Sequence, residues 1–324
     1  LCAQSREKRI SWFRDSDGDG IAEERGIFAD GENALDIPFG MAFAGGSFFV
    51  GNHDEVRRFP FAPGQTRLEG EGTRITELPG GGYRQHWTRN VIPAGDGEHL
   101  YVSIGSRTNV EPEAEPRATV QIMKLDGSER RTFAGGLRNA VGLAVHPQTR
   151  VLYATVNERD TLGDDLVPDY LTAIVDGAFY GWPYAYLSAG NLDPRRMRGA
   201  RSERPDLAQQ TRTPDVLFQA HSAALGVAFY DHDAFPEHYR GGAFVAFRGS
   251  WNRSTGTGYK LVFVPFAEGR PVGSYEDFVR GFLLDPAVPK TWGRPVGVLV
   301  LPDGSLVFTE EAGGAIYRVS YPAG

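Results

Sequence analysis

Polar and charged side chains flank a predicted β-hairpin near the middle of the 324-residue chain. Residues 141–145 form a short apolar run, and residues 151–156 form a second run rich in β-branched and aromatic side chains, after a turn. Arg138 and Asn139 precede the first run, and the sequence Asn-Glu-Arg-Asp at 157–160 follows the second. The beginning of one strand and the end of the next lie at the same end of an antiparallel hairpin. We therefore expect a guanidinium, an amide and carboxylates to converge there, as a site for an anionic ligand and a cation would require.

A histidine occupies the loop that leads into the next hairpin upstream. His86 follows the glycine-rich stretch 80–82 and precedes a predicted strand at 89–93. Glycine allows the backbone to approach its neighbours closely, so this loop can place His86 at the same edge of its sheet as Arg138. A neutral imidazole in such a position can act as a general base. In the alternative interpretation His86 packs beside Trp87 as an ordinary structural histidine.

Three more candidate side chains stand at equivalent places in later copies of the hairpin pattern. His221 precedes the fourth copy, Arg248 ends it, and Arg294 precedes the fifth. If the copies form a ring, these arginines and Arg138 gather at one end of its central channel. Like charges packed together need an anionic partner, and a tricarboxylate would supply one through bidentate pairs. In the alternative interpretation each is an ordinary surface arginine.

An acidic loop near the N-terminal end resembles the first half of a calcium-binding loop. Its oxygen-bearing residues alternate with small residues and are Asp15, Asp17 and Asp19. Gly26 stands where a bidentate glutamate is expected, although Glu23 or Glu24 could replace it in a shorter loop. A structural calcium site and a solvated acidic turn are both compatible with this stretch.

Two apolar runs joined by a turn recur along the chain. The five copies lie at 38–52, 89–105, 141–156, 225–247 and 296–309, and further apolar stretches follow most of them at 56–59, 121–125, 260–264 and 315–319. Small sheets that cannot bury their own faces and that repeat in this way are typical of a β-propeller. We predict an all-β, six-bladed propeller of four-stranded antiparallel blades that forms one catalytic domain over residues 1–324. Residues 1–13 would be the closing strands of an incomplete first blade.

The composition narrows the class of protein further. The chain has 41 glycines, 21 prolines and 12% aromatic residues, which favours many short strands joined by turns. Its net charge of −7 argues against a nucleic-acid or anionic-membrane partner. Cys2 is the only cysteine, so an internal disulfide and a cysteine-ligated zinc site are excluded. We find no apolar run of membrane-spanning length and no signal peptide.

Several short motifs occur together between residues 135 and 183. They are Arg138-Asn139 with Gly142-Leu143-Ala144, Leu152-Tyr153 before Asn157-Glu158, Asp164-Asp165 before Tyr170, and Gly177 with Tyr180-Gly181-Trp182-Pro183. In combination they resemble the soluble sugar dehydrogenases that depend on pyrroloquinoline quinone (PQQ), most closely the L-sorbosone dehydrogenase-like branch. The alternative interpretation is a generic propeller blade whose Gly-Trp-Pro forms a buried corner.

The resemblance implies a quinoprotein that oxidises an aldose or aldehyde sugar, of the glucose or sorbosone kind, by hydride transfer to PQQ. An external acceptor, such as a quinone, a cytochrome or a dye, would then take the electrons. The resemblance also implies a periplasmic or secreted protein.

The same resemblance assigns roles to residues of this chain. His86 corresponds to the catalytic base, and a Ca²⁺ that bridges the cofactor would be held by backbone carbonyls near Glu158 and Arg159. The side chains expected around PQQ are Arg138, which would also assist catalysis, Asn139, His221, Arg248 and Arg294. Trp87 and Trp251 are candidate contacts to the sugar.

One position departs from the glucose-oxidising branch of that family. Ser106 stands where that branch has the aspartate that orients the catalytic histidine, so the partner of His86 is open. Two other functions therefore remain: a calcium-dependent lactone hydrolase, whose metal would need several carboxylates and asparagines, and a propeller that binds a sugar or another ligand without turnover. The arginine-rich loops argue against the hydrolase.

Two insertions interrupt the repeats. Residues 111–117 form a loop rich in proline and glutamate, and residues 191–212 carry six arginines in an otherwise acidic protein. A solvated excursion is the ordinary interpretation of the second insertion, and a docking surface for an acidic electron acceptor is the alternative.

Overall fold

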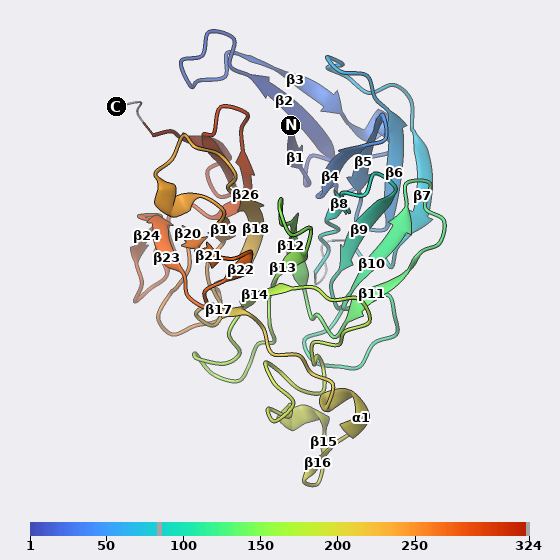
Figure 1. Ribbon diagram of the computed structural model, residues 1–324, viewed down its shortest axis with the longest axis vertical. Coiled ribbons are helices and arrows are strands. Elements are labelled where there is room, and N and C mark those ends of the chain that lie inside the picture. Colours follow the sequence, from blue (N-terminus) through green and yellow to red (C-terminus); the bar gives the residue numbers. More distant parts are fainter. Residues whose placement is uncertain (83–85, 322–324) are drawn as a thin grey trace. The chain divides into compact units, whose positions relative to one another are not determined.

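The computed structural model describes residues 1–82 and 86–321, which fall into two compact units (Figure 1). Unit 1 consists of Leu1–Thr108 and Glu113–Phe133. Unit 2 consists of Asn109–Pro112 and the chain from Ala134 onward. That both units belong to one catalytic domain stays a prediction.

Unit 1 is built from antiparallel sheets that follow one another along the chain. The first contains β1 (Cys2–Gln4), β2 (Arg9–Arg14) and β3 (Glu24–Ala29), and the short helix η1 (Gly31–Asn33) follows it. The second contains β4 (Met41–Ala44), β5 (Ser47–Gly51), β6 (Glu55–Pro60) and β7 (Thr73–Glu77). The third contains β8 (Val91–Pro93), β9 (His99–Ile104), β10 (Thr119–Lys124) and β11 (Arg131–Gly135). Each strand pairs with the next one in the chain, so each sheet is a meander.

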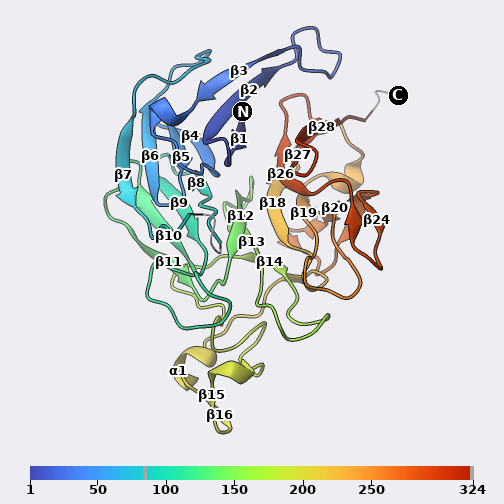
Figure 2. The same cartoon turned by 180° about the vertical axis from the view of Figure 1, so that it is seen from behind.

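Unit 2 repeats this arrangement (Figure 2). Its first sheet contains β12 (Ala140–Val145), β13 (Leu152–Val156), β14 (Tyr170–Ala173) and β17 (Val216–Leu217). The next contains β18 (Ala224–Phe229), β19 (Ala243–Phe247), β20 (Lys260–Val264) and β23 (Glu276–Val279), and the last contains β26 (Pro295–Val300), β27 (Leu306–Glu310) and β28 (Ala315–Val319). Small hairpins and short helices connect them: η2 (Pro194–Arg196), β15 (Met197–Arg198) with β16 (Arg201–Ser202), α1 (Pro205–Ala208), η3 (Glu237–Tyr239), β21 (Phe266–Ala267) with β22 (Arg270–Pro271), and β24 (Leu283–Asp285) with β25 (Lys290–Thr291).

The fold is an all-β, six-bladed β-propeller of antiparallel blades, as the sequence repeats predicted. Each of the five predicted hairpins is present, and the predicted third strands correspond to β6, β10, β20 and β28. Among the described residues, four sheets have four strands, and the β1–β3 and β26–β28 sheets have three. The stretch 1–13 does contain strands, and β3 joins them across the acidic loop.

Apolar side chains fill the space between consecutive sheets within each unit. One core cluster joins Phe49 and Val56 of the second sheet to Leu100 and Met123 of the third. In unit 2, residues of the β12 and β18 sheets form another cluster, and every residue of β13 and β19 is buried. A strand covered on both faces reads as a continuous apolar run. That is why 151–156 and 243–247 were recognisable in the sequence.

Glycine allows the innermost strands of neighbouring sheets to approach one another. A Cβ added to Gly142 in β12 would lie 2.1 Å from the carbonyl oxygen of Leu225 in β18, and one added to Gly226 would lie 2.6 Å from that of Val296 in β26. The pairing register of β12 with β13 also shifts between Ala140 and Leu143, around Gly142. Equivalent shifts occur in β18 and β26. The recurring glycine therefore marks a β-bulge that brings two backbones together.

Residues 191–212 project from the sheets of unit 2 and contain η2, β15, β16 and α1 (Figures 1 and 2). None of the helices in the described part of the chain is long and apolar enough to cross a membrane.

We expect Gly142→Ala to lower the free energy of unfolding by about 1–3 kcal/mol, because the added methyl group would overlap the Leu225 carbonyl. Gly190→Ala is the matched control, since a Cβ there meets only Ser188 Oγ, at 3.9 Å. Melting temperatures of the two variants test the expectation. Equal values would show that the β12–β18 contact tolerates a side chain.

Candidate functional site

The imidazole of His86 is held through one of its ring nitrogens. Nδ1 lies 2.9 Å from the carbonyl oxygen of Ser106 and 3.0 Å from its hydroxyl oxygen. The Ser106 hydroxyl donates its own proton to the Thr108 carbonyl at 2.7 Å, so it accepts from Nδ1. Nδ1 therefore carries the proton, and the lone pair is on Nε2. Ser106 is fully buried and fills the place of the orienting partner that the sequence left open.

Two guanidinium groups fix the backbone around this histidine. Arg89 is 1% exposed and donates to the carbonyls of His86 and Thr88, both at 2.8 Å. Burial, followed by the nearby positive charge of Arg117, lowers the pKa of Arg89 to about 9. Arg117 donates to the Gly80 carbonyl at 2.7 Å. The sequence singled out neither arginine, because the guanidinium groups bind backbone carbonyls, which any residue provides.

In unit 2 the guanidinium of Arg138 is 3% exposed and donates five hydrogen bonds. Nε and Nη2 bind the backbone and side-chain oxygens of Asn109 at 3.1 and 3.0 Å. Nη1 binds the carbonyls of Asn157 and Glu158 at 3.3 and 2.6 Å, and Nη2 also binds Asp160 Oδ2 at 3.0 Å. The predicted convergence of Arg138 with 157–160 is therefore present. Because arginine has five N–H groups, Arg138 has none left for a ligand in this arrangement.

Asp160 links Arg138 to His221. Its Oδ1 accepts a hydrogen bond from Asn252 Nδ2 at 2.7 Å and lies 3.6 Å from His221 Nδ1, while His221 Nε2 lies 2.9 Å from the Gly163 carbonyl. Burial alone would raise the pKa of Asp160, but the hydrogen bond to His221 and the charge of Arg138 lower it. The contact with Asp160 in turn raises the pKa of His221. Asp160 thus favours the charged form of His221, whose Nε2 can donate to the Gly163 carbonyl, while Nδ1 also lies 3.4 Å from Asn252 Nδ2.

Behind this cluster lie further carboxyl groups with little exposure. Burial raises the pKa of Glu158 to about 7 and that of Asp169 to about 6. Asp169 accepts from the backbone N–H groups of Glu158 and Ala223 at 2.9 and 2.7 Å. Arg159, 1% exposed at its side chain, pairs with Asp193 at 2.8 Å. The sequence analysis did not identify Asn109, Asp169 and Asn252 as site residues. Asn109 lies in the loop after β9, just as residues 157–160 lie in the loop after β13, and this equivalence could have identified it.

Several buried polar atoms of unit 2 have no hydrogen-bond partner among the described residues. They include Asn139 Oδ1, Glu158 Oε1, Tyr170 OH, Asn252 Oδ1 and Arg294 Nη1. An unpartnered buried polar group is costly. A bound ligand or cation could satisfy these atoms.

Arg248 directly follows β19, Arg294 directly precedes β26, and Glu311 contacts both. Arg248 Nε donates to Glu311 Oε1 at 2.6 Å, and the Glu311 N–H donates to the Arg294 carbonyl at 3.1 Å. The Arg294 guanidinium carbon lies 4.9 Å from the centroid of the Tyr259 ring, a cation–π arrangement. Of the predicted cationic residues, Arg294 thus keeps an unbonded donor, whereas Arg248 is paired.

The acidic loop between β2 and β3 gathers its carboxylates as predicted. One oxygen from each of Asp15, Asp17, Asp19 and Glu23 lies within 4.8 Å of the others. Part of their capacity is used locally, since Asp15 accepts from the N–H groups of Gly18 and Gly20 at 2.7 and 2.9 Å. Calcium binding by this loop stays a prediction.

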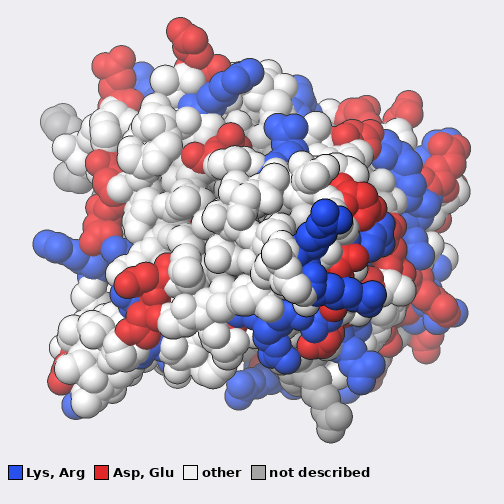
Figure 3. All heavy atoms as spheres, turned by 90° about the horizontal axis from the view of Figure 1, so that it is seen from below, with Lys and Arg blue, Asp and Glu red and all other residues white. Residues whose placement is uncertain are grey.

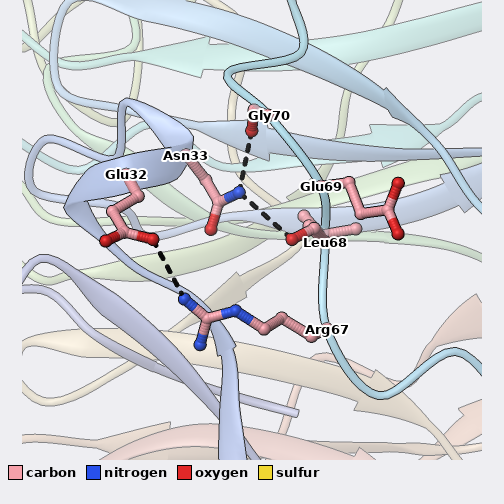
Figure 4. Close-up of a pocket in the computed structure, with 6 residues that line it drawn as sticks. All are labelled: Glu32, Asn33, Arg67, Leu68, Glu69 and Gly70. Atoms are coloured by element: carbon pink, nitrogen blue, oxygen red, sulfur yellow. Dashed lines mark hydrogen bonds and ion pairs between the residues drawn. The ribbon is translucent and has the colours of Figure 1, made fainter.

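The pocket drawn in Figure 4 contains none of the predicted site residues. It is lined by Glu32, Asn33, Arg67, Leu68, Glu69 and Gly70 of unit 1. Asn33 binds the carbonyls of Leu68 and Gly70 at 3.3 and 2.8 Å, and Arg67 pairs with Glu32. Asn33 and Arg67 are therefore engaged with neighbouring residues of unit 1.

The predicted residues are thus divided between the units. His86 lies in unit 1, and the residues expected around the cofactor, together with Glu158 and Arg159, lie in unit 2. Within unit 2, Arg138 and His221 both contact Asp160. A cavity shared by His86 and the arginines stays a prediction.

Comparison with known proteins identifies the family. The sequence profile of the TrAA12-like family matches residues 1–168 and 200–322. The chain belongs to the TrAA12-like family. An uncharacterized protein from Borreliella burgdorferi is 32% identical over 248 residues, which are 75% of this chain and 63% of that protein. The chain therefore matches less than two thirds of the length of this relative.

Two solved structures support the fold. A family AA12 carbohydrate-active enzyme from Trichoderma reesei superposes with a TM-score of 0.78 at 20% identity, over 95% of this chain and 86% of that one. The holo form of the PQQ domain of a pyranose dehydrogenase from Coprinopsis cinerea gives 0.73 at 18% identity, over 94% and 86%. The fold that the resemblance implied is thereby confirmed, whereas the L-sorbosone dehydrogenase-like branch stays a prediction.

We expect Asp160→Asn to destabilise the protein by about 3–5 kcal/mol near pH 6, because it breaks a buried charge cluster. Asp160 raises the pKa of His221 above its unfolded value. The stabilisation from this contact is complete below about pH 6.5 and is lost as the pH rises through the higher pKa of folded His221. The difference in melting temperature from wild type should therefore shrink towards pH 9, without vanishing, since Arg138 stays charged.

Asp165→Asn is the control for this titration. Its side chain is 89% exposed and pairs with Arg253 at 3.0 Å, so we expect a small, pH-independent effect. If the Asp160 variant shows the same loss at pH 6 and pH 9, His221 is not held as a cation by this carboxylate.

Proposed function

We propose that this protein is a PQQ- and Ca²⁺-dependent dehydrogenase that oxidises an aldose or a related aldehyde sugar and passes the electrons to an external acceptor. The observation that carries the proposal is the imidazole of His86, which is anchored through Nδ1 so that Nε2 can accept a proton. The family membership and the likeness to a PQQ domain support the choice of cofactor. A sorbosone-type substrate and a periplasmic or secreted location belong to the same proposal.

The residues of unit 2 fit an anionic cofactor only in part. Arg294 keeps a buried N–H that can bind a carboxylate, and Asn139 keeps an unbonded amide oxygen. Arg138 fits a supporting position better than direct contact, because its five donors are already bonded. His221 would contribute positive charge through its raised pKa. Arg248 offers less to the cofactor, because two of its nitrogens are paired with Glu311.

The oxygen atoms of Glu158 differ in how well they could bind Ca²⁺. The Glu158 carbonyl accepts a hydrogen bond from Arg138 at 2.6 Å, so a cation at that oxygen would face a guanidinium. The buried Glu158 Oε1, which has no partner, fits a cation better. We propose that this atom and the Arg159 carbonyl hold the ion. The loop with Asp15, Asp17 and Asp19 would hold a second, structural calcium.

When bound, PQQ supplies the hydride acceptor and Ca²⁺ the Lewis acid. The chain supplies the proton transfer: His86 Nε2 takes the hydroxyl proton of the sugar, or of the hydrated aldehyde. Ser106 keeps the ring from turning, and the guanidinium of Arg89 fixes the loop that carries it. Trp251, with 74% of its surface exposed, and Trp87 are available for contact with the sugar.

The alternative of a calcium-dependent lactone hydrolase finds less support. Such an enzyme needs several carboxylates on one metal in the channel. Within residues 1–82 and 86–321, the clustered carboxylates that could hold a metal are those of the loop at 15–23. Asp160 and Asp169 bind N–H groups instead, so Glu158 is the carboxylate that remains for a cation in unit 2. A propeller that binds sugar without turnover remains the other alternative, and activity measurements separate it.

We expect the purified protein to reduce a small dye with aldoses once PQQ and Ca²⁺ are added, and His86→Ala to slow this reaction by about 10²–10⁴-fold. Binding of PQQ, followed by its absorbance, should be unchanged in the variant. Opening of lactones without PQQ would indicate the hydrolase. Binding of PQQ and sugar without dye reduction would indicate the non-catalytic propeller.

Replacement of Ser106 tests the role of the hydroxyl. We expect Ser106→Ala to slow dye reduction only modestly, because the backbone carbonyl still binds Nδ1 at 2.9 Å. A carboxylate in Ser106→Asp would stabilise the imidazolium, so the acidic limb of the pH–rate profile should move to higher pH. An unchanged profile in Ser106→Asp would show that this residue does not set the basicity of His86.

We expect Arg294→Gln to weaken PQQ binding by about tenfold or more, because it removes the buried donor that is free to bind a carboxylate. Arg248→Gln is the matched control and should have a smaller effect, since its guanidinium is paired with Glu311. Titration calorimetry with PQQ in the presence of Ca²⁺ measures both. A larger loss in the Arg248 variant would reverse the assignment.

A further inference from the structure

The segment 191–212 has a net positive charge, whereas the chain as a whole is negative. It holds six arginines against Asp193, Glu203 and Asp206, a local balance of 6 − 3 = +3 in a chain of net charge −7. Figure 3 views the molecule from the side towards which Figure 1 draws this segment, and it shows basic and acidic side chains next to one another over part of that face. Some of the segment's charges are paired and others are not.

The pairing leaves three arginines over. Arg195 and Arg196 bind Glu111 at 3.5 and 3.1 Å. Arg204 binds Asp206 through two nitrogens, at 2.9 and 2.6 Å. Arg198, Arg201 and Arg212 remain without an ion-pair partner in the described part of the chain, and Arg198 and Arg201 belong to the same hairpin.

These two arginines face each other across a hairpin. Arg198 in β15 pairs in register with Arg201 in β16, and Gly199 adopts a left-handed φ of +64° in the two-residue turn between them. Both side chains are exposed. Like charges directly opposite one another destabilise a strand pair. We call residues 197–202 the arginine hairpin, and its register places two exposed arginines, without ion-pair partners among the described residues, directly opposite each other.

The base of the arginine hairpin is attached to the segments that bind Arg138. Asp193, just ahead of the hairpin, forms the buried ion pair with Arg159, whose neighbour Asp160 binds Arg138. Glu111, which holds Arg195 and Arg196, lies two residues from Asn109, which also binds Arg138. Ion pairs therefore join the residues that lead into the hairpin to two segments of the proposed cofactor site of unit 2.

The first half of the hairpin lies in a stretch that the family profile does not match. The TrAA12-like profile leaves residues 169–199 unmatched, and these include Arg195, Arg196 and Arg198 as well as β14. The two exposed like charges of the hairpin oppose its strand pairing, so a carboxylate of a partner that binds them would relieve this repulsion.

We propose that the arginine hairpin is the docking surface for an acidic protein that accepts the electrons; this partner rests on the dehydrogenase function proposed above. Two adjacent guanidinium groups bind carboxylates of a partner in bidentate pairs. A small basic patch on a segment whose base is fixed to the proposed cofactor site can orient an acidic acceptor. The chain's net charge of −7 opposes an extended polyanion such as nucleic acid or an anionic bilayer.

The test compares two double variants of the PQQ- and Ca²⁺-loaded protein. One is Arg198→Glu with Arg201→Glu, and the control is Arg270→Glu with Arg280→Glu, which changes net charge equally at exposed arginines outside the segment. The acceptors are a small dye and plastocyanin, an acidic blue-copper protein. At low ionic strength, we expect the hairpin variant to reduce plastocyanin at least about tenfold more slowly, with dye reduction unchanged. The difference should disappear at high salt.

The outcomes separate the two proposals. Equal rates of plastocyanin reduction in both double variants would overturn the docking proposal while dye reduction upholds the dehydrogenase. If no variant reduces dye, the dehydrogenase proposal fails, and plastocyanin binding alone, measured by calorimetry, still tests the hairpin. Binding of duplex DNA or of phosphatidylserine vesicles that depends on Arg198 and Arg201, without plastocyanin binding, would overturn the choice of an acidic protein.

Discussion

The buried guanidinium of Arg138 is the interaction on which the organisation of unit 2 depends. Its five hydrogen bonds reach Asn109, the carbonyls of Asn157 and Glu158, and the carboxylate of Asp160. These partners come from the segment that precedes β10 and from the end of β13, so one side chain fixes two loops that no strand pairing joins. A buried charge that loses its partner is costly. The loops therefore cannot move independently, and the positions of Asp160 and its neighbours follow from that of Arg138.

The charged groups around Arg138 compensate one another. Asp160 compensates Arg138 and also raises the pKa of His221, while Asp193 compensates Arg159. Asp169 accepts hydrogen bonds from two backbone N–H groups. Glu158 is left with one accepted hydrogen bond and a pKa raised by burial to about 7, so near neutral pH it is divided between its charged and neutral forms. A cation at this carboxylate would complete the charge balance. The proposed calcium position therefore depends on the same packing that buries Glu158.

The strands could be predicted well from the sequence because buried strands consist mostly of apolar residues. Runs such as 151–156 and 243–247 are apolar throughout since sheets cover both faces, and glycines such as Gly142 mark the close contacts. The sequence also predicted that Arg138 meets 157–160. It could not predict that every N–H of Arg138 is consumed there, because spacing gives a residue's place in a hairpin but not the number of oxygens around it. The Ser106 contact to His86 was missed for a similar reason: one of its two acceptors is a backbone carbonyl, which leaves no mark in the sequence.

Arginine serves two opposite purposes in this protein, and solvent exposure separates them. Arg89 and Arg138 are buried and bonded to carbonyls and carboxylates, so they hold loops in place and offer little charge to the surroundings. Arg198 and Arg201 are exposed on a two-residue turn, where water screens their repulsion and nothing in the described chain neutralises them. Composition counts all four alike, which is why a chain of net charge −7 can still present a basic contact surface. The buried pair Arg159–Asp193 joins the two sets, since it fixes the base of the exposed hairpin to the segment that Arg138 organises. Rigidity at the buried end is what would make the charges at the exposed end useful for orienting a partner.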